Sequence, residues 1–513
     1  MRTRNSILNI LVSFGTQAMS IILLFISRKV FLNYFTEEYL GINGLFTEIL
    51  TVLSLAELGI GTAMMYGLYD AVAKDDRKEI CQLMNLYRRL YTVVGVIVIG
   101  VGLAMLPFLD YLIKDNRIPH IRLIFLMYLA DSAVSYFLSY KQTIIQANQK
   151  AYVVSGVAMG IRCGQILLQI GSMVLLQNFY VYIAIQICGQ ICTNAVLSVV
   201  SGKLYPYLRR NKEGLPPKEK IQSVYRHIKA MALHKFGAVF VSNTDNILIS
   251  AFVGLGTVGL YSNYKMVLNS LKLALSYIYN AFTAGIGNLA ATEPGEKVYQ
   301  VYNCLNFVMS MLYGWAACCL WLLFNPFIGT FFGEKFVLSN VVVAIIVADF
   351  YLHGMRQMTL RFRDGMGLYW YDRYKPIFEV AINLIVSLLL VRRYSIAGVL
   401  IGTIVSSLLT NFWVEPYVLF RHGIQVGWKK GLGAYFLRYG KYTLFSLAAG
   451  GAAMFLVSLF PADSFLLLIA RAMVVTLVYG GAVLLVFGRT AEFRYLLEKL
   501  GSVVKKEHKK DPE

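Results

Sequence analysis

The sequence predicts an all-α, polytopic membrane protein. Of its 513 residues, 57% are hydrophobic, which is more than a soluble core requires. Apolar runs of about 18 or more residues recur from one end of the chain to the other, and each is long enough to cross a bilayer. In hydrocarbon only helices and closed barrels satisfy the backbone. These runs are too long for barrel strands and do not alternate, so we expect helices.

Counting the apolar runs gives about 14 transmembrane helices of roughly 20 residues each. The first run follows only Arg2 and Arg4 and lacks an A-x-A-like cleavage site, so we interpret it as a retained span rather than a signal peptide. The predicted spans lie near residues 6–26, 42–67, 90–108, 123–140, 151–176, 179–200, 236–254, 257–285, 304–325, 337–354, 376–391, 396–418, 442–460 and 465–487.

The formal net charge of +20 indicates orientation in a membrane. With the amino terminus in the cytoplasm, most Lys and Arg residues fall on one side of the membrane, as the positive-inside rule requires. They lie in segments 74–89, 203–235, 356–375, 421–441 and 489–510. We therefore expect a multi-pass protein of the bacterial cytoplasmic membrane with both termini in the cytoplasm. Because the basic residues are explained by topology, we expect no nucleic-acid partner.

Weak internal similarities predict a repeat. The segment IAIQICGQI (183–191) matches IAGVLIGTI (396–404) without a gap, and EYLGINGLF (38–46) resembles TVGLYSNYK (257–265). Their order indicates two pseudosymmetric six-helix bundles followed by two additional helices. An even number of spans in each half makes the repeats parallel, as in transporters that hold substrate between their halves.

These features predict the following domain organisation. The chain comprises a six-helix bundle at 1–201, a cytoplasmic linker at 202–235, a second six-helix bundle at 236–420, transmembrane helices 13–14 at 421–488 and a basic cytoplasmic tail at 489–513.

Several ionisable residues lie deep in the predicted spans. Placing a charged side chain at the centre of a membrane helix costs about 2.5–3.5 kcal/mol, so we expect these residues to face one another or water. Lys265 and Lys272 are seven residues apart and share a helix face. With Arg28 and Arg162 they predict a cationic cavity that binds an anion, above all a pyrophosphate. Three carboxylates are candidates for charge pairs or ion coupling, namely Glu57, Asp131 and Asp245.

Alternatives remain open for several of these residues. Asp245 can pair with Lys265 as a purely structural bridge or can serve in coupling. Arg28 can extend to the membrane interface from the end of its span. Glu57, in AELGIG, can form a local hydrogen bond beside the glycines.

No metal or cofactor pattern is present in the sequence. The seven cysteines show no zinc-like or redox spacing, and the six histidines form no metal motif. We therefore expect no metal and no cofactor, with coupling to H⁺ or Na⁺ left open.

Three segments together resemble the bacterial polysaccharide repeat-unit flippases, the Wzx-type exporters. They are SRKVFLNYFTEEYLGINGLFTEILTVLSLAELGIGTAMMYGLY (27–69), LHKFGAVFVSNTDNILISAFVGLGTVGLYSNY (233–264) and PIFEVAINLIVSLLLVRRYSIAGVLIGTIVSS (376–407). The family belongs to a superfamily that also contains multidrug antiporters and the lipid II flippase. The resemblance covers nearly the whole chain, but it rests on diffuse similarity rather than on a catalytic motif.

The resemblance implies two bundles arranged in a V and open alternately to either side. It implies movement of undecaprenyl-pyrophosphate-linked oligosaccharide from the inner to the outer leaflet, for O-antigen, capsule or exopolysaccharide synthesis. Arg28, Arg162, Lys265 and Lys272 match the family's cationic cavity, and Asp245 matches its recurrent Asp. Implied partners are the lipid-linked oligosaccharide, membrane lipids, and the polymerase and glycosyltransferases of the same pathway. We further expect Gln165 and Asn263 to contact sugars.

Three other functions compete with this one. A drug or cation antiporter of the same superfamily would need a net acidic cavity. A flippase for lipid II or a sporulation precursor would use the same mechanism on another cargo. A membrane polymerase or glycosyltransferase would need a large catalytic loop, whereas the predicted outer loops are short, such as FVGLGTV and FPADS. We therefore expect the protein not to be an enzyme.

Overall fold

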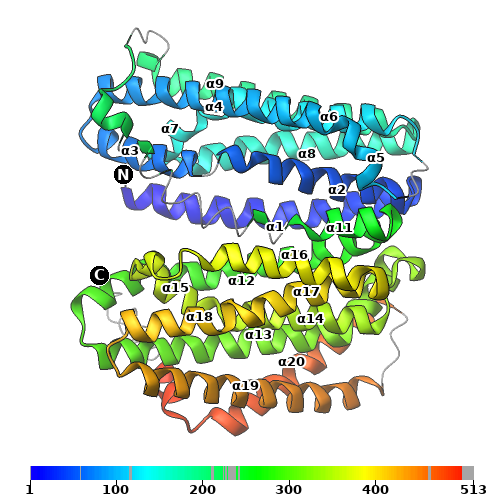
Figure 1. Cartoon of the computed structure of the whole chain (residues 1–513), viewed down its shortest axis with the longest axis vertical. Helices are drawn as coiled ribbons and strands as arrows, with labels where there is room; N and C mark the ends of the chain where they lie inside the picture. Colours follow the sequence, from blue (N-terminus) through cyan, green and yellow to red (C-terminus); the bar gives the residue numbers. More distant parts are fainter. Residues whose placement is uncertain are drawn as a thin grey trace, which may run out of the picture. The chain divides into compact units, whose positions relative to one another are not determined.

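The prediction of an all-α membrane protein is confirmed. The computed structural model of the chain describes residues 2–57, 59–114, 118–208, 213–222, 224–225, 228, 239–240, 243–459 and 464–498. Every regular element within these ranges is helical (Figure 1). In the same ranges, nine helical segments are long and apolar enough to cross a membrane.

Contacts between residues divide the chain into two compact units, Met1–Ser262 and Asn263–Glu513. The predicted domain limits are not tested, because 209–212 and much of 223–242 lie outside the described residues. Part of the seventh predicted span, 236–254, lies there too, as does the basic segment 505–510 of the tail.

The first unit consists of helices that overlap the predicted spans, although the predicted span 42–67 is divided between two helices and the third span begins earlier than predicted, at Arg77. Some of these helices are long, and others are short helical segments that continue them. They are α1 (Arg2–Tyr34), α2 (Glu37–Leu53), η1 (Ser54–Glu57), α3 (Ile60–Ala73), α4 (Arg77–Met105), η2 (Leu106–Phe108), α5 (Leu109–Leu112), α6 (Ile121–Ser139), α7 (Gln142–Ala147), α8 (Ala151–Leu175), α9 (Phe179–Leu204), η3 (Pro206–Leu208) and α11 (Asp245–Phe252). The first turns of α12 (Leu255–Thr292) also belong to this unit.

The second unit contains the remainder of α12 and the helices that follow it. They are α13 (Gly295–Phe332), η4 (Glu334–Phe336), α14 (Asn340–Met355), α15 (Gln357–Gly365), η5 (Leu368–Trp370), α16 (Lys375–Tyr394), α17 (Ile396–Leu409), α18 (Asn411–Val418), η6 (Leu419–Gly423), α19 (Trp428–Val457) and α20 (Phe465–Phe487). The last two pack on α13, where small residues such as Ala449 and Ala453 allow close approach.

Helices pack in the same order in the two units. In the first, α4 packs on α6, α6 on α9, and α8 on α9. In the second, α13 packs on α14, α14 on α17, and α16 on α17. The third to sixth predicted spans therefore contact one another in the same order as the ninth to twelfth, which is the arrangement that a duplicated bundle would produce.

The matching glycines of the repeat make matching contacts. In IAIQICGQI, a Cβ at Gly189 of α9 would overlap the side-chain amide of Gln165 on α8. In IAGVLIGTI, a Cβ at Gly402 of α17 would overlap the hydroxyl of Ser387 on α16. Each glycine therefore allows the last helix of its bundle to approach the preceding one closely.

A second pair of glycines lets α2 and the start of α12 cross at backbone contact within the first unit. A Cβ at Gly41 would overlap the carbonyl oxygen of Leu255, and a Cβ at Gly259 would overlap that of Glu37. The contact is reciprocal. Gly41 lies four residues after Glu37, whose carbonyl meets Gly259, and Gly259 lies four residues after Leu255, whose carbonyl meets Gly41. The similarity of EYLGINGLF and TVGLYSNYK therefore has a structural counterpart in which only glycine fits.

We expect Gly259→Ala to destabilise the protein, because the added methyl group would force the two helices apart at a cost of about 1–3 kcal/mol. Gly285→Ala is the matched control on the same helix, because a Cβ there meets nothing within 4 Å. The control should be neutral or stabilising by about 0.5–1 kcal/mol, since alanine favours helix more than glycine does. The free energy of unfolding in detergent distinguishes them, and equal effects would contradict the assigned crossing.

Candidate functional site

A polar cluster lies among the helices of the first unit, and two of the predicted site residues, Arg28 and Asp131, contribute to it. Arg28 on α1 interacts electrostatically with the phenol groups of Tyr128 on α6 and Tyr182 on α9. Tyr128 also interacts with Asp131, one turn further along α6. Gln186 of α9 donates a hydrogen bond of 2.7 Å to Asp131. We call these five residues the Arg28 cluster.

The Arg28 cluster has hydrogen-bonding capacity that the protein does not use. The Nη1 atom of Arg28, the hydroxyl of Tyr128 and the Oδ1 atom of Asp131 are buried without a hydrogen-bond partner among the described residues. Buried polar atoms normally have partners, because each unpaired one costs about 1–3 kcal/mol. The cluster can therefore accept a polar ligand or ordered water.

Arg162 lies close to the same cluster. Its side chain is exposed on α8, and it interacts electrostatically with Tyr182. Two of the four predicted cations, Arg28 and Arg162, thus interact electrostatically with the same tyrosine. Neither forms an ion pair with a carboxylate in the part of the chain that the structure describes. The sequence did not identify Tyr128, Tyr182 or Gln186, because uncharged residues in an apolar helix have no distinguishing pattern.

Gln165 is the predicted sugar contact on α8, and its side-chain amide lies against Gly189 of α9. Gln165 is partly buried. It therefore lies at a contact between two helices and not on an open surface. The role of Gln165 in sugar binding stays a prediction.

Glu57 accepts a hydrogen bond from the hydroxyl of Tyr91 on α4. Tyr91 in turn accepts one from Tyr87, with 3.1 Å between the oxygens. Gly61 lies against the same groups. This hydrogen bond joins Glu57 to a different helix and is therefore not the local one that the sequence left open, and it lies outside the Arg28 cluster. The role of Glu57 in coupling stays a prediction.

Asp245 is buried at the first position of α11. The next residue, Asn246, donates its backbone N–H to the buried carboxylate of Glu48 on α2, at 3.2 Å. Two carboxylates thus lie near the amino-terminal end of α11, where the helix dipole favours negative charge. Asp245 belongs to the first unit and Lys265 to the second, so their pairing stays a prediction.

The remaining predicted site residues lie on α12 in the second unit. Lys272 interacts electrostatically with Asp349 and His353 of α14. Lys265 is partly exposed. Asn263 is completely buried, and both atoms of its amide group lack a hydrogen-bond partner among the residues described here.

The second unit also contains an ion-pair network that the sequence did not reveal. Glu415 on α18 is completely buried. Arg356, between α14 and α15, donates to both of its oxygens, at 2.9 Å from Nε and 2.5 Å from Nη2. Lys375, the first residue of α16, donates to it as well. We call Glu415 with these two cations the Glu415 network.

A second buried pair extends the Glu415 network. Arg363 on α15 binds Asp372 in the segment before α16, and it also bonds to Asp364 at 2.8 Å. Lys375 lies 4.0 Å from Asp372 and so connects the two pairs. These charges are matched by opposite charges, in contrast to Arg28, so the network stabilises the packing of α14, α15, α16 and α18 rather than binding a ligand.

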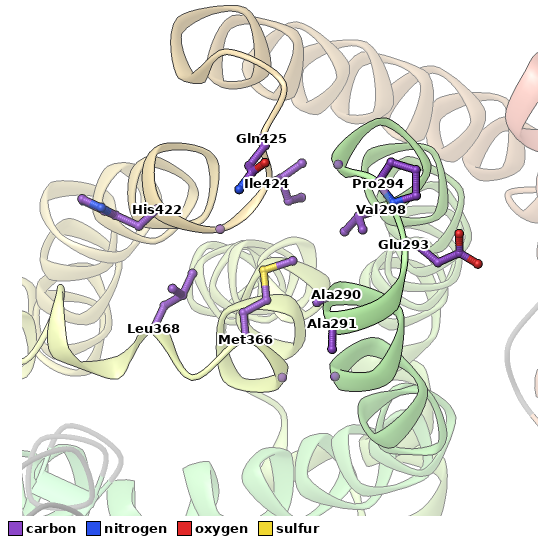
Figure 2. Close-up of a pocket in the computed structure, with 14 residues that line it drawn as sticks. Ala290, Ala291, Glu293, Pro294, Val298, Met366, Leu368, His422, Ile424 and Gln425 are labelled. Carbon is purple, nitrogen blue, oxygen red and sulfur yellow. The ribbon is translucent and has the colours of Figure 1, made fainter.

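A cavity of about 440 Å³ opens in the second unit, where α12 ends and α13 begins, beside the ends of α15 and η6 (Figure 2). Its wall is mostly glycine, alanine and aliphatic groups such as Met366 and Ile424. The carboxylate of Glu293 points away from it (Figure 2) and pairs with Lys297 at 2.6 Å. None of the predicted site residues lines this cavity.

Comparison with known proteins establishes the fold. No protein-family model and no curated protein matches the sequence. A solved lipid II flippase in an inward closed conformation matches with a TM-score of 0.63 and 13% identity, over 93% of this chain and 98% of that one. An inward-facing multidrug resistance MATE family transporter of the MOP superfamily matches with a TM-score of 0.60 and 14% identity, over 80% of this chain and 98% of that one.

A mutant MATE transporter from Vibrio cholerae also matches, with a TM-score of 0.52 and 14% identity, over 85% of this chain and 99% of that one. The chain therefore shares the fold of these transporters along nearly their whole length.

We expect Glu415→Gln to destabilise the protein by about 3–5 kcal/mol, because Arg356 and Lys375 would keep their buried charges without an anion. Glu293→Gln is the matched control, since it breaks an exposed pair worth at most about 0.5 kcal/mol. Unfolding of both variants in detergent, followed by tryptophan fluorescence, measures the difference. A Glu415 variant as stable as the control would show that the network does not hold the helices.

Proposed function

We propose that this protein is a transporter that flips undecaprenyl-pyrophosphate-linked oligosaccharide from the inner to the outer leaflet of the bacterial cytoplasmic membrane. The observation that carries the proposal is the Arg28 cluster, in which a buried guanidinium N–H lacks an acceptor and a second arginine, Arg162, interacts electrostatically with Tyr182. A pyrophosphate would supply the missing acceptor and the missing negative charge.

Arginine suits this cargo because its planar fork binds phosphate oxygens with two parallel hydrogen bonds. A buried cation without an anion is costly, so an incoming anion gains from relieving that cost. The unpaired hydroxyl of Tyr128 and Oδ1 of Asp131 would bind neighbouring polar groups, such as hydroxyls of the first sugar.

The extent of the structural similarity also favours a lipid-linked cargo. The lipid II flippase matches over 93% of this chain, whereas the MATE transporters match over 79–87% of it. The fold thus resembles a flippase of lipid-linked sugar over more of its length than it resembles a drug exporter.

The balance of charge at the Arg28 cluster argues against the drug or cation antiporter. Such a protein would need a net acidic site. Here two cations, Arg28 and Arg162, interact with the same tyrosine, and the one carboxylate of the cluster is Asp131. A flippase for lipid II remains the second candidate, because it would use the same pyrophosphate chemistry on a different sugar.

In the proposed mechanism, the pyrophosphate and first sugar enter from the cytoplasmic side while the prenyl tail stays in lipid. Arg28 and Arg162 bind the pyrophosphate, and Lys265 and Lys272 add positive charge. The two bundles then rock to expose the headgroup outside. Coupling to H⁺ or Na⁺ through Asp245, Glu57 or Asp131 would drive the cycle. The mechanism requires no covalent step and hence no enzymatic activity.

We expect Arg28→Glu to lower the flipping rate about 10- to 100-fold, the loss that removal of one or two hydrogen bonds to a charged group produces. Arg28→Lys should retain part of the activity, because it keeps the charge. The measurement uses purified protein in liposomes that carry a fluorescent prenyl-pyrophosphate oligosaccharide, and it follows headgroup accessibility with time.

Arg122→Glu is the control for this charge reversal, because Arg122 is exposed and pairs with Asp110 at 2.7 Å. Wild-type flipping by a folded Arg28→Glu variant would refute the role of the Arg28 cluster. Parallel liposomes with lipid II identify the cargo, and efflux of a cationic dye without flipping would instead establish the antiporter.

A further inference from the structure

Two groups of cations stacked on aromatic rings lie on the second unit. In the first group, the guanidinium of Arg373 lies 3.6 Å from the ring centre of Trp370 and 4.7 Å from that of Tyr374. These residues belong to YWYDRY, the segment that joins η5 to α16. At these distances the cation and the rings attract each other.

The second group involves η6 and the start of α19. Arg421 lies 5.3 Å from the ring centre of Trp428 and 5.8 Å from that of Tyr417. Lys429 adds a second positive charge, 5.6 Å from the Trp428 ring.

The two groups form one surface. Tyr371, between Trp370 and Arg373, stacks on His422, next to Arg421, with ring centres 3.8 Å apart and the planes nearly parallel at 8°. We call the continuous surface made by the Arg373 group, this stack and the Arg421 group the cation–aromatic strip.

The cation–aromatic strip is exposed and adjoins an apolar surface. Trp370 is 69% exposed and Tyr374 57%. Directly after them, the first turn of α16 exposes Ile377 and Phe378, the latter to 63%. Aromatic rings followed by exposed aliphatic residues at the end of a membrane helix are typical of the headgroup region of a bilayer.

The cations of the strip have no internal anion. Within the described ranges, neither Arg373, Arg421 nor Lys429 forms an ion pair. The nearest acidic residues in the sequence, Asp372 and Glu415, are buried and bound to Arg363, Arg356 and Lys375. The strip therefore presents uncompensated positive charge.

The Glu415 network holds the backbone segments that carry the cation–aromatic strip. Asp372, which Arg363 holds, lies directly before Arg373, and Glu415 lies two residues before Tyr417. Lys375 binds Glu415 and so connects the segment that carries the first group to α18, which carries Tyr417 of the second group. The two groups are thus held in place rather than carried on independent loops.

We propose that the cation–aromatic strip binds the headgroups of anionic phospholipids. The exposed cations would bind the phosphate oxygens, the tryptophan and tyrosine rings would lie among the glycerol and carbonyl groups, and Phe378 would enter the acyl region. A lipid fits better than an acidic peptide or a nucleic acid, because the strip continues into the apolar surface of a membrane helix. In the predicted topology this is the cytoplasmic leaflet, whose anionic lipids attract basic residues.

The test measures binding of phosphatidylglycerol and phosphatidylcholine to the full-length protein in neutral detergent, by native mass spectrometry of retained lipid and by thermal stabilisation. The wild type should retain phosphatidylglycerol preferentially. Arg373→Gln combined with Arg421→Gln should weaken this binding about 30-fold, since each basic residue near a membrane surface contributes roughly a factor of five. Binding of phosphatidylcholine should not change.

The control pair is Arg122→Gln with Arg393→Gln, which removes the same charge elsewhere. Arg393 also contacts a ring, that of Tyr394 at 5.5 Å, but it has no part in the strip. Equal loss in both pairs, or no preference of the wild type for phosphatidylglycerol, would overturn the proposal. If the first pair does not fold, Trp370→Phe serves instead in liposomes of brominated phosphatidylglycerol. Quenching that this substitution lowers more in brominated phosphatidylglycerol than in brominated phosphatidylcholine supports the proposal, and an equal decrease in the two lipids contradicts it.

Discussion

The packing of the second unit depends on the requirement that a carboxylate in an apolar interior be matched by cations. Glu415 is completely buried, and leaving it without partners would cost several kcal/mol. Arg356 and Lys375 meet this requirement from two other parts of the chain. Because the three residues come from α18, the start of α16 and the junction of α14 with α15, one interaction fixes the relative positions of all these helices.

The first unit shows the opposite balance of charge. There a buried cation, Arg28, has a guanidinium nitrogen without a partner, while the nearby carboxylate Asp131 is bonded to Gln186 through one of its two oxygens. The same physical rule therefore gives different consequences in the two units. Removing one partner of a satisfied buried ion pair destabilises a structure, whereas an unsatisfied guanidinium in low dielectric favours an external anion. This contrast is the physical basis for placing substrate binding at Arg28 and structural support at Glu415.

The sequence predicted those features that depend on local pattern. Hydropathy located the helices, and the glycines of IAIQICGQI and IAGVLIGTI identified positions that prove to be close helix contacts. Arg28, Arg162 and Asp131 were identifiable because a charge in an apolar run is conspicuous. Tyr128 and Tyr182 were not, because a tyrosine there resembles any aromatic residue. Glu415 was missed because it lies near the end of a predicted span, and its partner Arg356 was assigned to a solvated loop.

The basic residues of the second unit accordingly have more than one role, although the positive-inside rule treats them alike. Arg356, Arg363 and Lys375 are bound to buried carboxylates and hold helices together. Arg373 lies on the exposed ring of Trp370 and Arg421 on the partly buried ring of Trp428, where their charge remains available to an anion outside the protein. A count of charges fixes which end of a helix faces the cytoplasm. Only the position of each carboxylate determines which cations are already paired and which can bind lipid.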